Sequence, residues 1–324
     1  MELKLKTRFY FKTIFARILA AFLITTTLVG GYRLWELYRD QFYQGERQPY
    51  LQLSSSDSML IRWQTEAPNQ GQIRFGLDPR NLDRILDEEE SRIEHFIELT
   101  QLTPNTKYYY SIGDVRTRQP IYQGPQFWFS MPDLSKRNTT SRIWILGDPG
   151  KPGKDQNAVR DAAYSWFAEN DRPDMPPIDL IVTLGDNAYT SGTNQQFQDS
   201  FFEPYQDVLR NTPVLPACGN HDNRRNVIFH LFDFPTEAQL GGYPSHTERY
   251  FSLNYQDVHL IFLDSTSRHV TEKSSMIHWL IQDLKKNDRL WTLVILHHPP
   301  YTKGSHDSDD LSDSDGRMAW VRGT

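Results

Sequence analysis

The sequence predicts two folded parts in tandem, an all-β sandwich followed by an α/β domain. Residues 48–131 hold short runs of alternating apolar and polar residues, separated by turn residues. Several strands at this spacing are typical of a sandwich of roughly immunoglobulin size. From residue 142 onward the pattern changes to apolar strands that alternate with helices, which is typical of an α/β domain. A length of 324 residues suits two domains of ordinary size.

Composition and charge narrow the function classes. The net charge is −6 and no long basic run follows the extreme N-terminus. Because coating a nucleic acid requires clustered Lys and Arg, no nucleic-acid binding is expected. Hydrophobic residues make up 38% and aromatic residues 13%, which suits a globular, partly β protein. The single cysteine, Cys218, cannot form a disulfide within the chain, so an oxidising compartment is permitted but not indicated. No pattern indicates the oligomeric state.

Residues 1–32 predict a signal peptide or an N-terminal membrane anchor. Within residues 1–17, five basic residues and a single acidic one precede an apolar stretch from Ile18 to Tyr32. This stretch is shorter than the about 20 residues of a full span. An ordinary amphipathic helix is the alternative, but the charge asymmetry favours export. We therefore expect the rest of the chain to be periplasmic, secreted, or membrane-anchored with its catalytic domain outside the cytoplasm.

The sandwich is predicted between two polar segments. A tether, residues 33–47, leads into it, and a segment rich in turn residues, 132–141, leads out of it as a linker. The acidic run from Asp87 to Glu90 predicts a solvated loop. The strands are predicted at residues 59–65, 71–77, 94–102, 107–113 and 126–130.

The α/β domain, residues 142–324, is predicted from apolar runs and helical spacing in alternation. Two strands within 250–265 are expected to turn at Gln256 and Asp257. The other strands are expected at residues 142–148, 178–186, 212–222 and 290–301, and the helices at 155–170, 194–209 and 274–287.

Four apolar strands of this domain end in polar residues. They lead into GDPG (147–150), GDNAY (185–189), GNHD (219–222) and HHPPY (297–301). In α/β sheets, polar groups at the carboxyl ends of strands converge on one crevice. Carboxylates, an amide, a phenol and imidazoles form a donor set that suits iron, zinc or manganese. Because there are too many ligands for one ion, we predict two metals that share a carboxylate.

Each motif alone also has a structural interpretation. Gly-Asp after a strand is common as a turn or a helix cap, and a single His at a strand end is more often a hydrogen-bonded surface group. Asp264, in IFLDS, resembles the other strand-end acids, but no His, Asn or Gly-Asp surrounds it, so we interpret it as a cap or loop residue. His298 is interpreted either as a residue that supports the metal ligands without binding the metal or as a structural residue. Four such strand ends in one domain favour the metal site.

The order GDxG, GDNxY, GNHD and VxxH resembles the metallophosphoesterases of the calcineurin-like superfamily, and within them the purple acid phosphatases. Residues 48–131 are similar to the fibronectin-like N-terminal domain of the large plant-type members, with PYLQL near the start and LTPNTKYYY near the end. The resemblance implies a fibronectin III-like sandwich followed by a metallophosphoesterase domain of the αββα type.

The resemblance also implies a dinuclear metal centre. Many related phosphoesterases carry a histidine ligand at the position of Gly150, and Tyr189 replaces it here, as is typical of the purple acid phosphatases. A phenol with an ordinary pKa of about 10 ionises near neutrality only beside a strong Lewis acid, so Fe(III) paired with Zn, Fe or Mn is expected. The implied ligands are Asp148 and Tyr189 on the first ion, Asp186 on both, and Asn220 and His297 on the second.

The resemblance implies hydrolysis of phosphate monoesters. Two cations would hold the ester and lower the pKa of a bound water, which would attack phosphorus in line with the leaving group. In the family, the histidine at the place of His221 faces the substrate, where it would stabilise the phosphoryl charge or protonate the leaving group. Asp222 would hold His221 in place, and His306 is a second acid candidate. A phosphodiesterase or nucleotide hydrolase on the same scaffold is the alternative.

The sequence departs from the family pattern at its end. The family closes its site with a GHxH motif whose two histidines ligate one metal each, and the sequence up to Thr324 contains no such motif. We therefore expect the catalytic domain to be incomplete at its C-terminus, and missing ligands lower metal affinity. A catalytically inactive, truncated protein whose sandwich serves a binding role is a further alternative.

Overall fold

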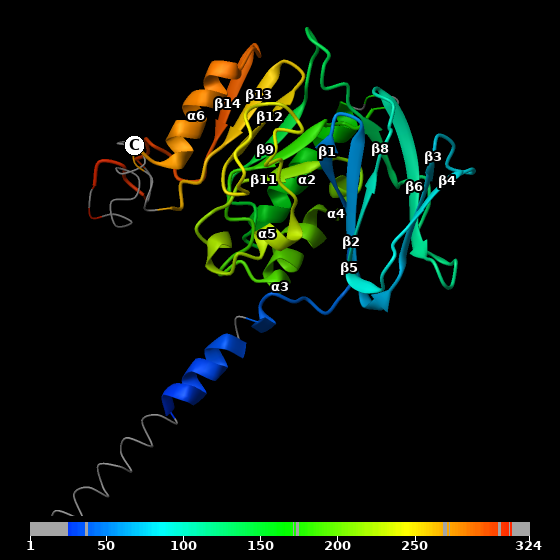
Figure 1. Ribbon diagram of the computed structural model, residues 1–324, viewed down its shortest axis with the longest axis horizontal. Helices are drawn as coiled ribbons and strands as arrows, with labels where there is room; N and C mark the ends of the chain where they lie inside the picture. Colours follow the sequence, from blue (N-terminus) through cyan, green and yellow to red (C-terminus); the bar gives the residue numbers. More distant parts are fainter. Residues whose placement is uncertain are drawn as a thin grey trace, which may run out of the picture. The chain divides into compact units, whose positions relative to one another are not determined.

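The computed structural model describes residues 25–35, 38–170, 172, 175–267, 271, 273–303, 306–310 and 312 (Figure 1). The chain divides into two compact units, residues 1–42 and 43–324. In the first unit residues 25–35 are helical, and most of the predicted signal peptide or anchor, residues 1–32, lies outside the described residues. Among the described helices, none combines the length and apolar character needed to cross a bilayer.

The second unit begins with the predicted β-sandwich. Both sheets are antiparallel, and all five predicted strands are present. The structure adds strands that the alternating runs did not predict, β1, β4 and β7. One sheet has the order β1 (Arg47–Ser55), β2 (Ser58–Asn69), β5 (Arg92–Leu99), and the other has β4 (Arg84–Asp87), β3 (Gly71–Gly76), β6 (Thr106–Asp114), β7 (Pro120–Tyr122), with β8 (Trp128–Met131) also paired to β6.

The acidic run between β4 and β5 agrees with its prediction as a solvated loop at Asp87, Glu89 and Glu90, which are exposed, but not at Glu88. Asp87 ends β4, and Glu88 is only 7% exposed. Oε2 of Glu88 lies 2.7 Å from Nδ1 of the buried His95 and accepts from the backbone N–H of Gly71 at 3.1 Å. Charged residues are rarely buried unless they are paired, and the partner of Glu88 comes from another strand. Composition alone therefore could not identify it.

The α/β part contains two small sheets. In the first, strands β9 (Ile143–Leu146), β10 (Leu180–Thr183) and β11 (Val214–Pro216) are parallel, in the order β11-β10-β9. In the second, β12 (Phe251–Tyr255) and β13 (Val258–Phe262) form the predicted hairpin, and β14 (Trp291–Ile295) runs parallel to β13. The four strands that end in polar motifs therefore belong to two sheets.

The helices follow the sequence prediction closely. The predicted helix 194–209 is a continuous run of α3 (Asn194–Phe197), a π-helical turn (Gln198–Phe202) and α4 (Glu203–Leu209). Thr193 caps its start through a capping box with Gln196. The remaining helices are α2 (Lys154–Glu169), α5 (Ile228–Leu231) and α6 (Ser275–Lys286), with a short 3-10 helix at Asp222–Arg224.

A buried polar cluster fastens α6 to the second sheet. Asp283 of α6 is fully buried, its Oδ2 lies 2.7 Å from Nε2 of His259, and its Oδ1 accepts from Ser252 at 2.5 Å. Figure 1 shows α6 alongside β13 and β14. Because each buried polar atom of this cluster has a partner, the burial carries little desolvation penalty.

The sandwich and the α/β part share one hydrophobic core. Arg47, at the start of β1, is 2% exposed and donates to Gln198 at 2.9 Å and to Asn194 at 2.5 Å. On the other sheet, the hydroxyl of Tyr110 donates to the backbone oxygen of Arg210 at 2.8 Å. Both sheets of the sandwich are thus anchored to the α/β part.

Candidate metal centre

Two aspartates stand where β9 and β10 end. Asp148 and Asp186 each follow a glycine, and each has a positive φ, 49° and 54°. Few residues other than glycine adopt this left-handed conformation, and aspartate is among those that tolerate it. The conformation turns each chain sharply at the sheet edge. Such backbone conformations persist where the surroundings impose them, and they cluster at functional sites.

Glycines let the loops that carry these aspartates approach one another. A Cβ on Gly150 would lie 2.1 Å from the backbone carbon and oxygen of Asn187, and a Cβ on Gly219 would lie 2.1 Å from the backbone nitrogen of Asp186. Real Cβ atoms do not come so close to backbone atoms. The GDPG loop and the GDNAY loop therefore leave no space for a histidine at position 150.

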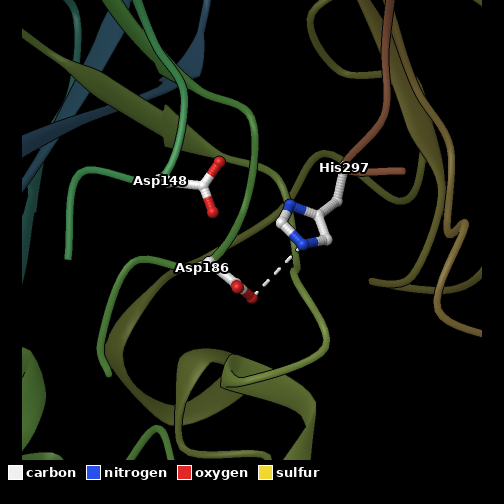
Figure 2. Close-up of side chains that lie close together, drawn as sticks. All are labelled: Asp148, Asp186 and His297. Atoms are coloured by element: carbon white, nitrogen blue, oxygen red, sulfur yellow. Dashed lines mark ion pairs between the residues drawn. The ribbon is translucent and has the colours of Figure 1, made fainter. Parts of the chain in front are cut away.

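Three side chains from separate strand ends converge at this edge. Oxygens of Asp148 and Asp186 and a ring nitrogen of His297 lie within 4.8 Å of one another, and Figure 2 shows all three around a common space. Nε2 of His297 lies 3.4 Å from Oδ1 of Asp186 and 3.0 Å from Oδ1 of Asn220. Four of the five implied metal ligands are therefore close together.

The donor set at this point suits a cation. Nδ1 of His297 lies 3.0 Å from the backbone oxygen of Leu184, which can only accept, so Nδ1 carries a proton. In the neutral ring, Nε2 then presents a lone pair to two further acceptors, the oxygens of Asp186 and Asn220. Electron pairs that face each other are unfavourable, and a metal ion between them removes the conflict. These residues therefore fit a metal of the kind the family implies.

The fifth implied ligand, Tyr189, adjoins the first aspartate. Its hydroxyl donates to Oδ1 of Asp148 at 2.5 Å. Burial and hydrogen bonds to Asp148 and Asp186 raise the pKa of Tyr189 well above its usual value. The phenol therefore stays protonated beside two bare carboxylates, and ionising it would require a positive charge at the same place.

His221 lies on the open side of this cluster. Its backbone N–H donates to Oδ1 of Asp186 at 2.9 Å, and its Nε2 lies 3.8 Å from Oδ2 of the same residue. Its Nδ1 donates to the backbone oxygen of Thr190 at 2.6 Å, and its ring centroid lies 4.4 Å from that of Tyr189. The Thr190 carbonyl therefore orients the imidazole.

Asp222 does not orient His221 through its carboxylate, contrary to the sequence prediction. It is fully buried and accepts from the backbone N–H and the side-chain amide of Asn187, each at 2.9 Å, and from the N–H groups of Ala188 and Gly219. Burial raises the pKa of Asp222 to about 6, although the bonds from Gly219 and Asn187 act in the opposite direction. Its contacts join the loops that follow β10 and β11.

Arg224 is a residue that the sequence reasoning missed. It is exposed, and its Nη1 donates to the backbone oxygen of Thr190 at 3.0 Å, the same oxygen that binds His221. The signal that could have identified it is the basic pair Arg224-Arg225, which follows GNHD after one intervening residue, Asn223. A guanidinium beside a candidate phosphate site adds positive charge where phosphate oxygens would lie.

The remaining candidates have structural partners or lie apart. His298 is buried, with Nδ1 3.0 Å from the hydroxyl of Ser265. Asp264 is 3% exposed and accepts from the backbone and side chain of Thr266, which agrees with its prediction as a loop residue. His306 is exposed, and residues 304–305 before it lie outside the described part of the chain, so its role stays a prediction.

Comparison with known proteins agrees with this fold. Residues 47–131 match the family described as Purple acid Phosphatase, N-terminal domain, and residues 141–321 match the family described as Calcineurin-like phosphoesterase. Among solved structures, a purple acid phosphatase isolated from yellow lupin (Lupinus luteus) seeds is similar, with a TM-score of 0.62 and 14% identity, over 81% of this chain and 52% of that one. At this identity the likeness shows the fold.

Two curated relatives align with most of the chain. Purple acid phosphatase 21 of Arabidopsis thaliana is 24% identical over 283 residues, and Acid phosphatase type 7 of Homo sapiens is 24% identical over 295 residues. The alignments cover 82% and 81% of this chain but 59% and 60% of the relatives. The chain thus spans about 60% of the length of these relatives. With more than half of its residues matched by one family, the chain belongs to the calcineurin-like phosphoesterases, and it carries the N-terminal domain of the purple acid phosphatases ahead of that domain.

Proposed function

We propose that this protein hydrolyses phosphate monoesters at a two-metal centre, as an acid phosphatase. One observation carries the proposal: the carboxylate of Asp186 and the amide oxygen of Asn220 both lie close to Nε2 of His297, so that three electron-pair donors meet at one place. The names of the two relatives support the reaction class. Asp148 and Tyr189 would hold one ion, Asn220 and His297 the other, and Asp186 both.

The metal ions and the chain's own residues would divide the chemistry. When bound, Fe(III) with Zn, Fe or Mn would supply Lewis acidity that neutralises phosphate charge. Because Nδ1 of His221 donates to Thr190, Nε2 is the atom that can exchange a proton, and we assign it to the leaving-group oxygen. Arg224, held by the same carbonyl, would bind a phosphate oxygen. Asp222 would act indirectly, by holding the loops together.

Metal analysis and hydrolysis assays test the proposal together. The full chain would be loaded with iron and zinc and assayed with an aryl phosphate monoester and with the matching diester. We expect two bound ions and faster turnover of the monoester. Asp186→Asn should lower metal affinity by more than about 100-fold, because even the loss of a group that only hydrogen-bonds to a metal ligand costs about 10- to 100-fold. Asp264→Asn, a buried strand-end acid outside the cluster, is the matched control.

Each outcome has a distinct meaning. Turnover of the diester alone would contradict the monoester assignment and leave the metal centre intact. Equal metal content in the two variants would contradict the centre itself. A visible absorption band that disappears in Tyr189→Phe would support a phenolate bound to Fe(III), and its persistence would remove Tyr189 from the ligand set.

We also propose that the α/β domain acts outside the cytoplasm. The support is the basic flank and apolar stretch within residues 1–32. Fractionation of cells that express the full chain should place it in the periplasm, the medium or the membrane. Recovery in the cytosol would contradict export.

A further inference from the structure

The outer face of one sandwich sheet carries a hollow that the proposed reaction does not use. In the pairing of β3 with β6, Arg74 lies opposite Ser111 and Gly76 lies opposite Tyr109. Because successive residues of a strand face opposite sides, Arg74, Ser111 and Tyr109 lie on the outer face while Phe75 faces the core. A cation, a hydroxyl and an aromatic ring are therefore neighbours on one surface.

Two loops form the walls of the hollow, and two glycines make room for them. A Cβ on Gly76 would lie 2.8 Å from the backbone oxygen of Asn81, and a Cβ on Gly113 would lie 2.8 Å from the backbone oxygen of Gln119. The loop after β3 and the loop after β6 can therefore fold down onto the sheet at these positions. The outer face between them is left recessed.

The recess consists of two adjoining cavities. One, of about 170 Å³, lies at Arg74 and Arg118, and the other, of about 360 Å³, lies beside Tyr109. Ser111 and Gln123 line both cavities, so the two are neighbours on this face of the sheet. Together they offer an elongated site with a charged end and an aromatic end.

The charged end is suited to an anion. Its lining includes Arg74 and Arg118 together with Gln119 and Gln123, and none of the described residues that line it carries a carboxylate. This local excess of two positive charges is unusual in a chain whose net charge is −6. Guanidinium groups bind carboxylate, phosphate and sulfate groups through paired hydrogen bonds.

Arg74 is held in position from one side. Asp87 of β4 accepts from the side-chain amide of Gln72 at 2.7 Å, and Gln72 in turn accepts from Nε of Arg74 at 2.8 Å. This chain of bonds uses one N–H of the guanidinium and leaves the terminal nitrogens for a ligand. An arginine held in this way loses less conformational entropy on binding.

The aromatic end is suited to the body of a sugar. Tyr109, Pro79 and Leu82 line it, with the Ser111 hydroxyl and the Gln123 amide at its junction with the charged end. Ring faces pack against the apolar faces of sugar rings, while hydroxyls and amides bind their hydroxyl groups. We propose that this recess binds an acidic saccharide, a hydroxyl-rich ring that bears a carboxylate, phosphate or sulfate group.

Calorimetric titration of the full chain tests the proposal. The probes are a galacturonic acid trimer, a glucose trimer and inorganic phosphate, at low ionic strength. We expect the acidic trimer to bind, the neutral trimer to bind at least about tenfold more weakly, and salt to weaken the binding of the acidic trimer. Arg74→Gln and Arg118→Gln should each raise its dissociation constant about fivefold or more, since each removes a charge-assisted bond. Arg116→Gln is the matched control, because Arg116 is an exposed arginine of the same loop outside the lining.

The outcomes separate the sources of binding. If Arg74→Gln weakens binding of the acidic trimer but not of phosphate, phosphate has its site elsewhere, at the metal centre for example. That result supports the proposal, because the recess then recognises the saccharide and not the anion alone. The proposal is overturned if the acidic trimer does not bind at millimolar concentration, if the neutral trimer binds equally well, or if the Arg74 and Arg118 variants behave like the Arg116 variant. Far-UV circular dichroism of each variant confirms that the fold is retained.

Discussion

At the scale of single residues, Gly150 has a clear physical reason to be glycine. It lies against the peptide that joins Asn187 to Ala188, where a Cβ would be 2.1 Å from backbone atoms. The sequence showed the absence of a histidine at this position, and the structure supplies the steric cause. The phenol of Tyr189 lies beside Asp148 instead.

A pair of alanine variants measures this constraint. Gly150→Ala should lower the free energy of unfolding by about 1–3 kcal/mol, because overpacking forces the neighbouring backbone to shift. Gly147→Ala, in the same GDPG motif, should change it by less than about 0.5 kcal/mol, since its Cβ would meet only Leu184 at 3.8 Å. Urea denaturation of both variants measures the difference. Equal effects would show that the close approach at Gly150 does not constrain the fold.

At the scale of elements, local pattern and long-range pairing contribute differently. The predicted strands and helices are present where alternation and helical spacing placed them, because those periods are local properties of the chain, while β1, β4, β7 and α5 had no such signal. The partner of Glu88 is His95 on β5, and the partners of Asp283 are on β12 and β13. Such hydrogen-bonded pairs join separate elements, and the sequence around either residue does not indicate its partner.

Two neighbouring glutamates allow a test of the Glu88 pair. Glu88→Ala should lower the free energy of unfolding by about 1–3 kcal/mol, because it leaves the buried His95 ring and the backbone N–H of Gly71 without their acceptor. Glu89→Ala removes the same group from an exposed position and should have an effect within about 0.5 kcal/mol. The midpoint of urea unfolding measures both. A similar, small effect of the two variants would contradict a stabilising role for the pair of Glu88 with His95.

At the scale of the whole molecule, folding of the second unit removes several tyrosines from solvent, at least in part, and this affects how the free energy of unfolding depends on pH. Burial raises the pKa of Tyr122 to about 12 and also raises the pKa values of Tyr110 and Tyr255. The corresponding value in an unfolded chain is about 10. The folded protein therefore holds protons that the unfolded chain has released, and stability depends on pH in the alkaline range.

The sign of this dependence follows from the raised pKa values. The contribution of Tyr122 is fully present below pH about 10 and is lost as pH rises through its folded-state pKa of about 12. The free energy of unfolding should therefore fall steadily over this range. Tyr122→Phe should make the fall less steep, because phenylalanine has no proton to release. Denaturation curves at several alkaline pH values measure both slopes, and parallel slopes would contradict the assignment to Tyr122.

Particular residues show how much of the candidate site can be predicted from the sequence. Asp148, Asp186, Asn220 and His297 were selected because each follows an apolar strand, and the structure brings them together. Their roles as ligands stay predictions. Asp222 was assigned to His221 because the two are adjacent in the chain, but its carboxylate binds the loop after β10. The sequence prediction omits Arg224, because a basic pair after a polar motif is common on protein surfaces and does not by itself indicate a site.

The amino-acid pattern was sufficient to predict the two fold classes, most of the strands and helices, and the strand ends that carry polar groups. It was sufficient because apolar periodicity and turn residues act over a few positions. The folded chain alone shows that these strand ends come from two sheets, that Asp222 joins loops and that two glycines open a recess on the sandwich. Those features depend on contacts between segments far apart in the chain, and no local pattern specifies such partners.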